Sequence, residues 1–179
     1  MHGYALGMAM DVCSAADMRI CSKDTVFCVK EVDIGIASDI GILARLPKVV
    51  GSYTWVKDVA MSGRNFNADE ALRVGFVSTV LPTKNGVMEE AFRVARNLSG
   101  KSPVAVQTIK HFLDYSRDRT VAEGTSYICV QVLERDRVLI LNSGLQYQLA
   151  YNVAAVQTKD VPVAISSMLS KEKPVFGKL

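Results

Sequence analysis

The sequence predicts an α/β fold in its front half and a mainly helical arrangement in its back half. Short β-prone runs bounded by turn residues are concentrated before about residue 82, and apolar residues recur at helical spacing from residue 87. The chain has 179 residues, of which 49% are hydrophobic and 22% charged, so it can bury one substantial core. It contains no internal repeat or low-complexity linker.

The chain begins with a helix and two short strands. Apolar residues on several sides of Met8–Ala16 predict a buried helix, and Gly7 stands where that helix should begin. The β-prone runs Asp17–Cys21 and Thr25–Val29 predict two strands separated by a short polar turn. Glu31 then lies just past the second strand.

Two capped helices are expected next. Ser38 or Asp39 can cap a helix that runs through Ile42–Leu46, and Pro47 limits that helix or marks a break in it. A glycine and a serine then open a second helix over Tyr53–Met61.

A short helix and a strand close the α/β half. Ala68–Leu72 predicts a helix that Gly75 stops, and Phe76–Leu81 is strongly β-prone up to the proline that follows it. The later pattern is mainly helical over Val87–Leu98 and over Pro103–Tyr115, where the proline occupies the first turn. One stretch breaks this order, because residues 138–149 have the pattern of strand, turn and strand.

The composition disfavours several classes of function. The net charge is +3 and the basic residues are scattered, so there is no stripe suited to nucleic acid, although a few lysines can meet a small anion. No apolar run approaches the roughly 20 residues that a membrane-spanning helix needs, which predicts a soluble protein. The 4 cysteines lack C-x-x-C spacing, which predicts reduced, mostly buried thiols in an intracellular compartment.

Three stretches of the chain carry a resemblance to a known family. His2–Asp11 is a glycine-containing turn that leads into a helix with an acid, Phe27–Gly35 places an acid after a strand, and Ala68–Val77 has the pattern A-x-E-A-x-x-x-G-F-V. In this order and at this separation they resemble the enoyl-CoA hydratase/isomerase (crotonase) family. The likeness runs through about residue 127 and resumes at about residue 151.

The resemblance implies a fold and a subgroup. The expected fold is a crotonase-like (ClpP/crotonase) spiral, with a partial β-β-α core over residues 1–100 and a C-terminal helical trimerisation region over residues 101–179. Within the family, the block from Val29 to Gly41 resembles the Δ3,5-Δ2,4-dienoyl-CoA isomerases, because it carries acids at both Glu31 and Asp39. Hydratases resemble the chain at positions 11 and 31 but typically have glycine at the equivalent of position 39.

The resemblance also implies roles for five residues. Moving two double bonds into conjugation with a thioester requires a proton to leave the carbon beside the carbonyl and another to be returned farther along the chain. By resemblance, Glu31 and Asp39 are the catalytic acid/base pair, and Asp11 is a third acid that lines the pocket and tunes them. The turn at Gly7 and Met8 resembles the family's donor of an N–H group to the dienolate oxygen. Met8 stands where the family usually has glycine, so its side chain could crowd the thioester.

Each acid also has an ordinary interpretation. Taken alone, Asp39 is a helix N-cap, Asp11 a helix-surface acid and Glu31 a solvated residue at a strand end. Asp33 is interpreted as a turn or partner-facing acid. His2 or His111 could form a Cys–His nucleophile with a cysteine, but no activating third group has a recognisable spacing, which favours ordinary packing.

The chain departs from the family in two places. The part that normally precedes the equivalent of His2 is absent, so we expect the chain as written to be weakly active or inactive. The segment at about residues 130–150 has no counterpart in the family and is expected to be an atypical insertion. At the other end, Gly177-Lys178-Leu179 resembles the S-K-L peroxisomal address, with the mitochondrion as the alternative location.

Three functions are compared. The leading hypothesis is an isomerase that converts 3,5-dienoyl-CoA to 2,4-dienoyl-CoA in the β-oxidation of unsaturated fatty acids. It needs no metal or redox cofactor, since coenzyme A is part of the substrate. Its expected partners are the acyl-CoA thioester and copies of itself in a homotrimer or hexamer, without nucleic acid or a membrane span. The alternatives are an enoyl-CoA hydratase and a catalytically inactive assembly subunit.

Overall fold

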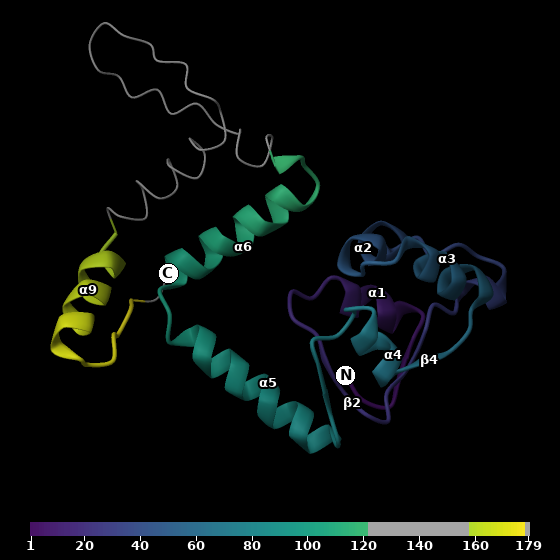
Figure 1. The fold of residues 1–179 in the computed structure, drawn as a ribbon, viewed down its shortest axis with the longest axis horizontal. Coiled ribbons are helices and arrows are strands. Elements are labelled where there is room, and N and C mark those ends of the chain that lie inside the picture. Colours follow the sequence, from purple (N-terminus) through teal and green to yellow (C-terminus); the bar gives the residue numbers. More distant parts are fainter. Residues whose placement is uncertain (122–157, 178–179) are drawn as a thin grey trace, which may run out of the picture. The chain divides into compact units, whose positions relative to one another are not determined.

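The computed structural model describes residues 1–121 and 158–177. The chain divides into two compact units, Met1–Val94 and Ala95–Leu179. The first unit mixes short strands with short helices, which confirms the predicted α/β class (Figure 1). Its elements are β1 (Tyr4–Leu6), α1 (Met8–Ser14), β2 (Ile20–Ser22), β3 (Val26–Cys28), the 3₁₀ helix η1 (Glu31–Ile34), α2 (Ile42–Val49), α3 (Tyr53–Ser62), β4 (Phe66–Asn67), α4 (Ala68–Arg73) and β5 (Thr79–Leu81).

The strands of this unit form two small sheets. In one sheet, β3 lies between β1, to which it is parallel, and β4, to which it is antiparallel. In the other, β2 pairs with β5 in parallel. Consecutive strands β2 and β3 therefore belong to different sheets. The turn predicted between them does not close a hairpin but carries the chain from one sheet to the other.

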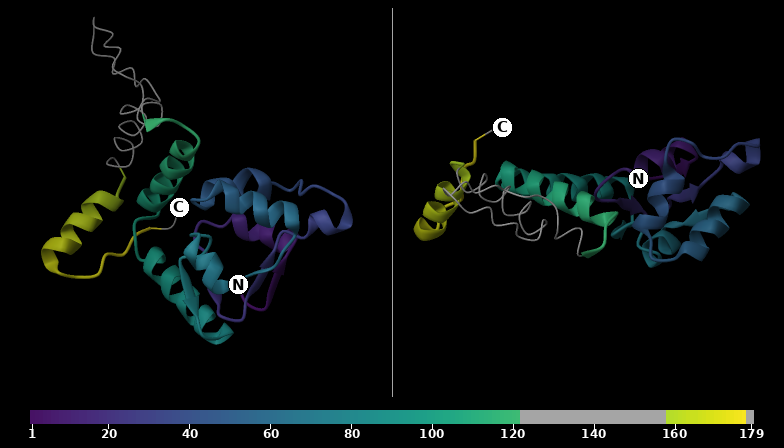
Figure 2. Two further views of the ribbon diagram at one scale, coloured as in Figure 1. Left: turned by 45° about the vertical axis from the view of Figure 1, so that its right-hand side comes forward. Right: turned by 90° about the horizontal axis from the view of Figure 1, so that it is seen from above.

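Helix α1 follows β1 and packs on the next helix of the chain. It contacts both β1 and α2, and α2 in turn contacts α3. Both views in Figure 2 show α1 beside α2. The predicted helix over Met8–Ala16 is thus confirmed, with its end at Ser14.

Aromatic rings form the centre of the core in the first unit. The ring of Phe27 stacks on that of Phe66 with centroids 5.2 Å apart, and its edge meets Phe76 at 5.7 Å. Trp55 of α3 packs edge-on against Phe66 at 5.0 Å. Three strand and loop residues and one helix residue therefore join the larger sheet to α3 through ring contacts.

Several predicted helix boundaries are confirmed by their caps. Ser52 accepts a hydrogen bond from the backbone N–H of Trp55 at 3.2 Å and so opens α3. The side chain of Asn67 does the same for α4, accepting from Glu70 N at 2.8 Å. Gly75 follows α4 with a φ of 81°, a left-handed conformation that suits glycine after a helix end.

The predicted caps of α2 are wrong. Neither Ser38 nor Asp39 caps this helix; its N-cap residue is Gly41, and no side chain at that position accepts a hydrogen bond. The carboxylate of Asp11, on α1, accepts from the backbone N–H of Ile42 at 2.6 Å instead. Pro47 lies inside the helix and does not end it, since α2 continues to Val49.

Strand β5 is shorter than the predicted run Phe76–Leu81. The backbone N–H groups of Phe76 and Val77 both donate to the carbonyl of Ala71, at 2.9 and 3.3 Å. These two bonds continue the turn after α4, and both side chains are buried. The N–H of Ser78 then donates to the carbonyl of Arg19 at 2.8 Å, and the pairing with β2 begins at Thr79.

The second unit is helical where it is described. Its elements are α5 (Lys84–Ser99), which begins in the first unit, α6 (Pro103–Arg117) and α9 (Asp160–Ser170). Pro103 stands at the start of α6 as predicted, and Ser102 caps that helix by accepting from Ala105 N at 3.1 Å. The hydroxyl of Ser102 also donates to Asp160 Oδ2 at 2.5 Å, which ties the start of α6 to the start of α9.

Some predictions fall outside the described residues. These are the insertion at about residues 130–150, with its strand-turn-strand pattern, the fourth cysteine, and the last two residues of the C-terminal tripeptide. The described cysteines, Cys13, Cys21 and Cys28, are free thiols, and burial raises the pKa of each. Among the described residues, no helix is long and apolar enough to cross a bilayer.

Candidate active site

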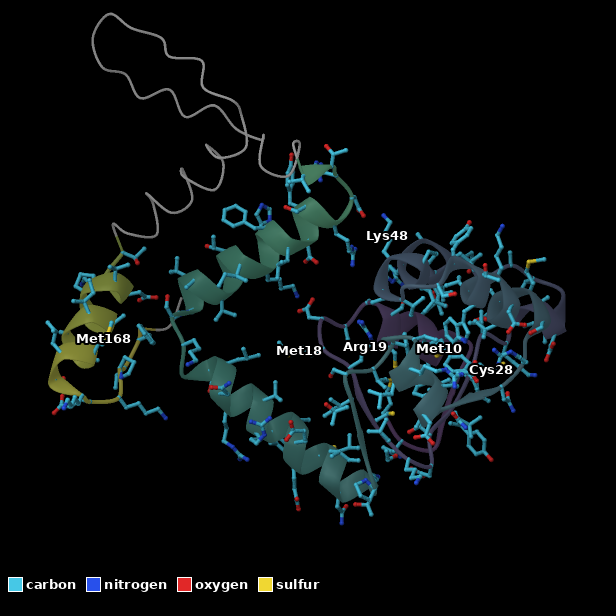
Figure 3. The ribbon with its side chains drawn as sticks, in the orientation of Figure 1. Met10, Met18, Arg19, Cys28, Lys48 and Met168 are labelled. Atoms are coloured by element: carbon cyan, nitrogen blue, oxygen red, sulfur yellow. The ribbon has the colours of Figure 1, made fainter. Side chains whose placement is uncertain are left out.

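The turn from β1 into α1 is the first component of the candidate site. Gly7 has φ 53° and ψ −120°, the mirror image of the first central residue of a type II turn, and this conformation favours glycine. Its N–H donates to the carbonyl of Cys28 at 2.9 Å, which continues the pairing of β1 with β3. Figure 3 labels Met10 and Cys28, which mark the two elements that meet at this turn.

The first turn of α1 presents backbone N–H groups. The amides of Met10 and Asp11 donate to the carbonyl of Gly7, at 2.7 and 3.3 Å. The amides of Met8 and Ala9 precede them and have no carbonyl within the helix to reach, as at any helix start. Met8 is 65% exposed, so its side chain is not part of the core.

Glu31 lies against this turn. A β-carbon built on Gly7 would sit 3.1 Å from Oε1 of Glu31, which shows how closely the carboxylate approaches the glycine. The other oxygen, Oε2, is buried and has no hydrogen-bond partner among the described residues. The ordinary interpretation of Glu31 as a solvated strand-end residue is therefore wrong. A buried carboxylate oxygen without a partner is costly, and such groups are typical of functional sites.

Helix η1, which carries Glu31, is docked on the end of α3. A β-carbon on Gly63 would lie 2.8 Å from Asp33 Oδ1 and 2.9 Å from Val32 Cγ1, so η1 and the end of α3 touch where glycine leaves space. The thiol of Cys28 donates to the carbonyl of Gly63 at 2.9 Å and fixes the strand that precedes η1. Asp33 lies inside η1 and pairs with Lys30 on the surface, and its interpretation as a turn or partner-facing acid stays a prediction.

Asp11 is buried, with 1% of its surface exposed, so the ordinary interpretation as a helix-surface acid is wrong. Its Oδ1 accepts from Ile42 N at 2.6 Å and lies 3.5 Å from Nη2 of Arg45. This carboxylate therefore joins α1 to the start of α2. Its predicted role as a third acid of the pocket stays a prediction.

Asp39 lies in the segment that links η1 to α2, and its side chain is exposed. The structure thus brings together Gly7, Met8 and Glu31 at one turn. Asp39 lies eight residues beyond Glu31, on the segment between η1 and α2. The hydrogen bond from Ile42 N to Asp11 ties the end of this segment to α1. The role of Asp39 in proton transfer stays a prediction.

Arg45 is the residue that sequence reasoning missed. Its Nε donates to Ser14 Oγ at 2.9 Å, and its Nη2 donates to the carbonyls of Asp11 at 3.2 Å and Ile40 at 3.4 Å. An arginine beside a predicted helix start, with a buried acid elsewhere, is too common a pattern to identify this contact from sequence. The pairing becomes visible only when α1 and α2 are packed together.

This arrangement can perform acid/base chemistry at an acyl group. A carboxylate with one buried oxygen that has no partner among the described residues lies against the Gly7 turn, and the first N–H groups of the helix that starts there can donate hydrogen bonds to a carbonyl oxygen that gains negative charge. In the described part of the chain, no three His, Cys, Asp or Glu side chains gather as metal ligands. The thiol of Cys28 donates to the carbonyl of Gly63, and the interpretation of the histidines and cysteines as ordinary packing residues stays a prediction.

Comparison with known proteins decides the family. The sequence model described as enoyl-CoA hydratase/isomerase matches residues 1–134. The chain belongs to this family. Among solved structures of the family, an enoyl-CoA hydratase from Mycobacterium tuberculosis H37Rv superposes with a TM-score of 0.81 at 21% identity, over 98% of this chain and 61% of that one. A probable enoyl-CoA hydratase/isomerase from Mycobacterium abscessus gives 0.80 at 20% identity, over 98% and 60% of the two chains. The crotonase-like fold is thereby confirmed.

Members of the family with curated names are similar at higher identity. The chain is 38% identical over 182 residues to the mitochondrial Δ(3,5)-Δ(2,4)-dienoyl-CoA isomerase of Rattus norvegicus, across 100% of this chain and 50% of the relative. It is 34% identical over 179 residues to the peroxisomal enzyme of that name from Arabidopsis thaliana, across 100% and 57%. A carnitinyl-CoA dehydratase of Salmonella arizonae is 37% identical over 128 residues, across 72% and 48%. The chain therefore spans about half the length of the relatives it matches.

Proposed function

We propose that the protein isomerises 3,5-dienoyl-CoA to 2,4-dienoyl-CoA. The observation that carries acid/base chemistry on an acyl-CoA is the position of Glu31, whose carboxylate lies against the Gly7 turn with one oxygen buried and without a partner among the described residues. The likeness to dienoyl-CoA isomerases of rat and Arabidopsis supports the substrate class. Asp39, at a position where hydratases of the family typically have glycine, supports the choice of isomerisation.

The position of Glu31 favours a direction for the proton transfer. The thioester oxygen would accept from the Met8 amide at the start of α1, and the adjacent carbon, C2, would then face Glu31, whose carboxylate lies against the same turn. Glu31 removes a proton from C2, and the electron pair moves into an enolate, conjugated with both double bonds, that the amide stabilises. Asp39 donates a proton to C6, so the double bonds shift from C3=C4 and C5=C6 to C2=C3 and C4=C5. No electron is gained or lost, and no water is consumed.

Hydration of a 2-enoyl-CoA is the second candidate function. The likeness to a carnitinyl-CoA dehydratase supports it, since that protein's name describes the removal of water from an acyl-CoA. Both reactions require a carboxylate beside the thioester turn, so Glu31 cannot distinguish them. Asp39 can, because a second acid farther along the acyl chain serves only the isomerisation.

The test assays the full-length protein with both 3,5-dienoyl-CoA and 2-enoyl-CoA. We expect Asp39→Asn to lower kcat for isomerisation by at least about 10²-fold, the usual contribution of a general acid, and to spare any hydration. Glu31→Gln should abolish both. Asp33→Asn, two residues from Glu31 and paired with Lys30 on the surface, is the matched control and should keep both activities. Equal loss of both activities in Asp39→Asn would contradict the assigned role.

We also propose that catalysis needs no metal or redox cofactor. A second proposal is that the protein works as a homotrimer or hexamer. A third is that it is located in a mitochondrion or peroxisome. The names of the rat and Arabidopsis relatives support both organelles. Activity after dialysis against a chelator, and sedimentation of the purified protein, test the first two points. Fluorescent fusions with and without the last three residues test the third, since loss of peroxisomal import on their removal would identify the address.

A further inference from the structure

A polar cluster joins the α1 helix to the start of α2, behind the segment that carries Asp39. Its centre is the guanidinium of Arg45, which donates to Ser14 Oγ and to the carbonyls of Asp11 and Ile40. Two of these acceptors are on α1, and the third is the residue directly after Asp39. One side chain therefore connects a fixed helix to the segment of interest.

The cluster includes a buried counter-ion. The Asp11 carboxylate is 1% exposed and lies 3.5 Å from Arg45 Nη2, while the Arg45 side chain is 28% exposed. A buried carboxylate needs a paired charge and hydrogen bonds, and Asp11 obtains these from Arg45 and from the Ile42 amide. The ion pair thus also holds the first residue of α2, three positions beyond Asp39.

Gly41 allows the guanidinium to approach the backbone of this segment. A β-carbon on Gly41 would lie 2.5 Å from Nη1 of Arg45, and the glycine has a φ of 123°. No other residue type fits this position without moving Arg45. The backbone at Ile40 and Gly41, directly after Asp39, is therefore in close contact with the guanidinium of Arg45.

We propose that Arg45 is a positioning residue for the proposed isomerisation: by binding α1 and Ile40 together, it holds the segment that presents Asp39. This inference rests on the proposed function for its catalytic consequence. Arg45 itself touches neither Glu31 nor the Gly7 turn in any described contact, so its removal should affect proton delivery at C6 more than proton removal at C2. Lysine cannot replace it fully, because a single ammonium cannot reproduce the planar set of donors.

The test combines one structural and one kinetic measurement on the full-length protein. The variants are Arg45→Met, Arg45→Lys and Gly41→Ala, with Arg64→Met as the matched control. Arg64 makes an equally dense set of ion pairs, with Asp58 and Glu70, in another part of the first unit. Gly41→Ala displaces the guanidinium without removing it, so it serves if Arg45→Met fails to fold.

Hydrogen exchange tests the positioning itself. We expect exchange of the backbone amides in residues 36–42 to accelerate by about tenfold or more in Arg45→Met and Gly41→Ala, by less in Arg45→Lys, and not in Arg64→Met. Unchanged exchange of this segment in Arg45→Met and Gly41→Ala would overturn the proposal. Hydrogen exchange requires no turnover, so it tests the positioning role of Arg45 whether or not the enzyme is active. If the wild type does not isomerise dienoyl-CoA, that result refutes the proposed function and leaves the positioning role standing.

Kinetics test the consequence for catalysis. In deuterated water, Arg45→Met should lower kcat for isomerisation and leave KM nearly unchanged, while the recovered 3,5-dienoyl-CoA still exchanges its C2 proton through Glu31. Adding Arg45→Met to Asp39→Asn should lower kcat no further, because each change removes the same step, proton delivery by Asp39 at C6. If Arg45→Met lowers turnover by the same factor with and without Asp39, Arg45 acts on stability alone and the proposal is wrong.

Discussion

The carboxylate of Glu31 lies against the α-carbon of Gly7, where a β-carbon would sit 3.1 Å from Oε1. The two residues come from different elements, the turn after β1 and the start of η1, and the parallel pairing of β1 with β3 brings them together. Glycine at position 7 therefore serves two purposes. It adopts the positive φ that the turn needs, and it leaves room for the carboxylate.

We expect Gly7→Ala to lose more activity than stability. The backbone conformation alone, with φ 53° and ψ −120°, should cost about 1–3 kcal/mol of folding free energy for a residue with a β-carbon. The added methyl group would also displace Glu31 from the turn, which should lower kcat by at least about tenfold, because small misplacements of a catalytic group are costly. Steady-state kinetics and thermal unfolding measure the two effects.

Gly3→Ala is the control for this change. Gly3 has a φ of 63°, close to the 53° of Gly7, but no atom lies within 4 Å of an added β-carbon. It should therefore show a similar loss of stability and nearly normal kcat. Equal kcat in both variants would show that the approach of Glu31 to Gly7 has no catalytic importance.

The elements of the site could be predicted from the sequence more readily than their contacts. Glycine and the helix after it, the strand before Glu31, and the Ser52 cap all depend on residues close in the chain, so local pattern was sufficient. The cap of α2 was predicted wrongly because its acceptor, Asp11, lies 31 residues away from Ile42. A buried acid whose hydrogen-bond donor lies on another helix leaves no pattern among its neighbours in the sequence. The contacts of Arg45 could not be predicted for the same reason.

Gly63→Ala should disturb the site from a distance. A β-carbon there would lie 2.8 Å from Asp33 Oδ1 and 2.9 Å from Val32 Cγ1, and the φ of 62° adds strain. Because η1 carries Glu31, its displacement should lower kcat several-fold in addition to a loss of about 1–3 kcal/mol in stability. Gly75→Ala, with a φ of 81° and no atom within 4 Å, should lose stability only. Retention of full kcat by Gly63→Ala would show that η1 is held by other contacts.

Phe27→Ala should destabilise the first unit strongly. Its ring is fully buried between Phe66 and Phe76, so the substitution leaves a cavity and removes two ring contacts. We expect a loss of about 3–5 kcal/mol in the free energy of unfolding, measured with urea. Phe92→Ala, at a position 56% exposed on α5, should change it by less than about 0.5 kcal/mol. A loss below about 1 kcal/mol for Phe27→Ala would mean that the core repacks around the missing ring.

The stability of the first unit should depend on pH through Glu70. Its carboxylate accepts from Arg64 through both oxygens, at 2.7 and 3.2 Å, and from Trp55 Nε1 at 2.7 Å. Arg64 holds the pKa of Glu70 below its ordinary value, so the folded state gains stability once the carboxyl is ionised. Because the Arg64 side chain is 36% exposed, water screens the pair, and we expect only about 1 kcal/mol.

Comparison of the wild type with Glu70→Gln in urea at several pH values tests this linkage. The advantage of the wild type should be complete above about pH 5, since an unfolded glutamate titrates near about 4.3, and it should shrink as the pH falls through the lower folded-state pKa. Glu90→Gln is the control, because Glu90 pairs with Arg93, whose side chain is 65% exposed, and this pair should contribute little at any pH. A difference between wild type and Glu70→Gln that stays constant from pH 7 to pH 3 would mean that the Trp55 hydrogen bond and side-chain packing, and not the charge of Glu70, provide its contribution.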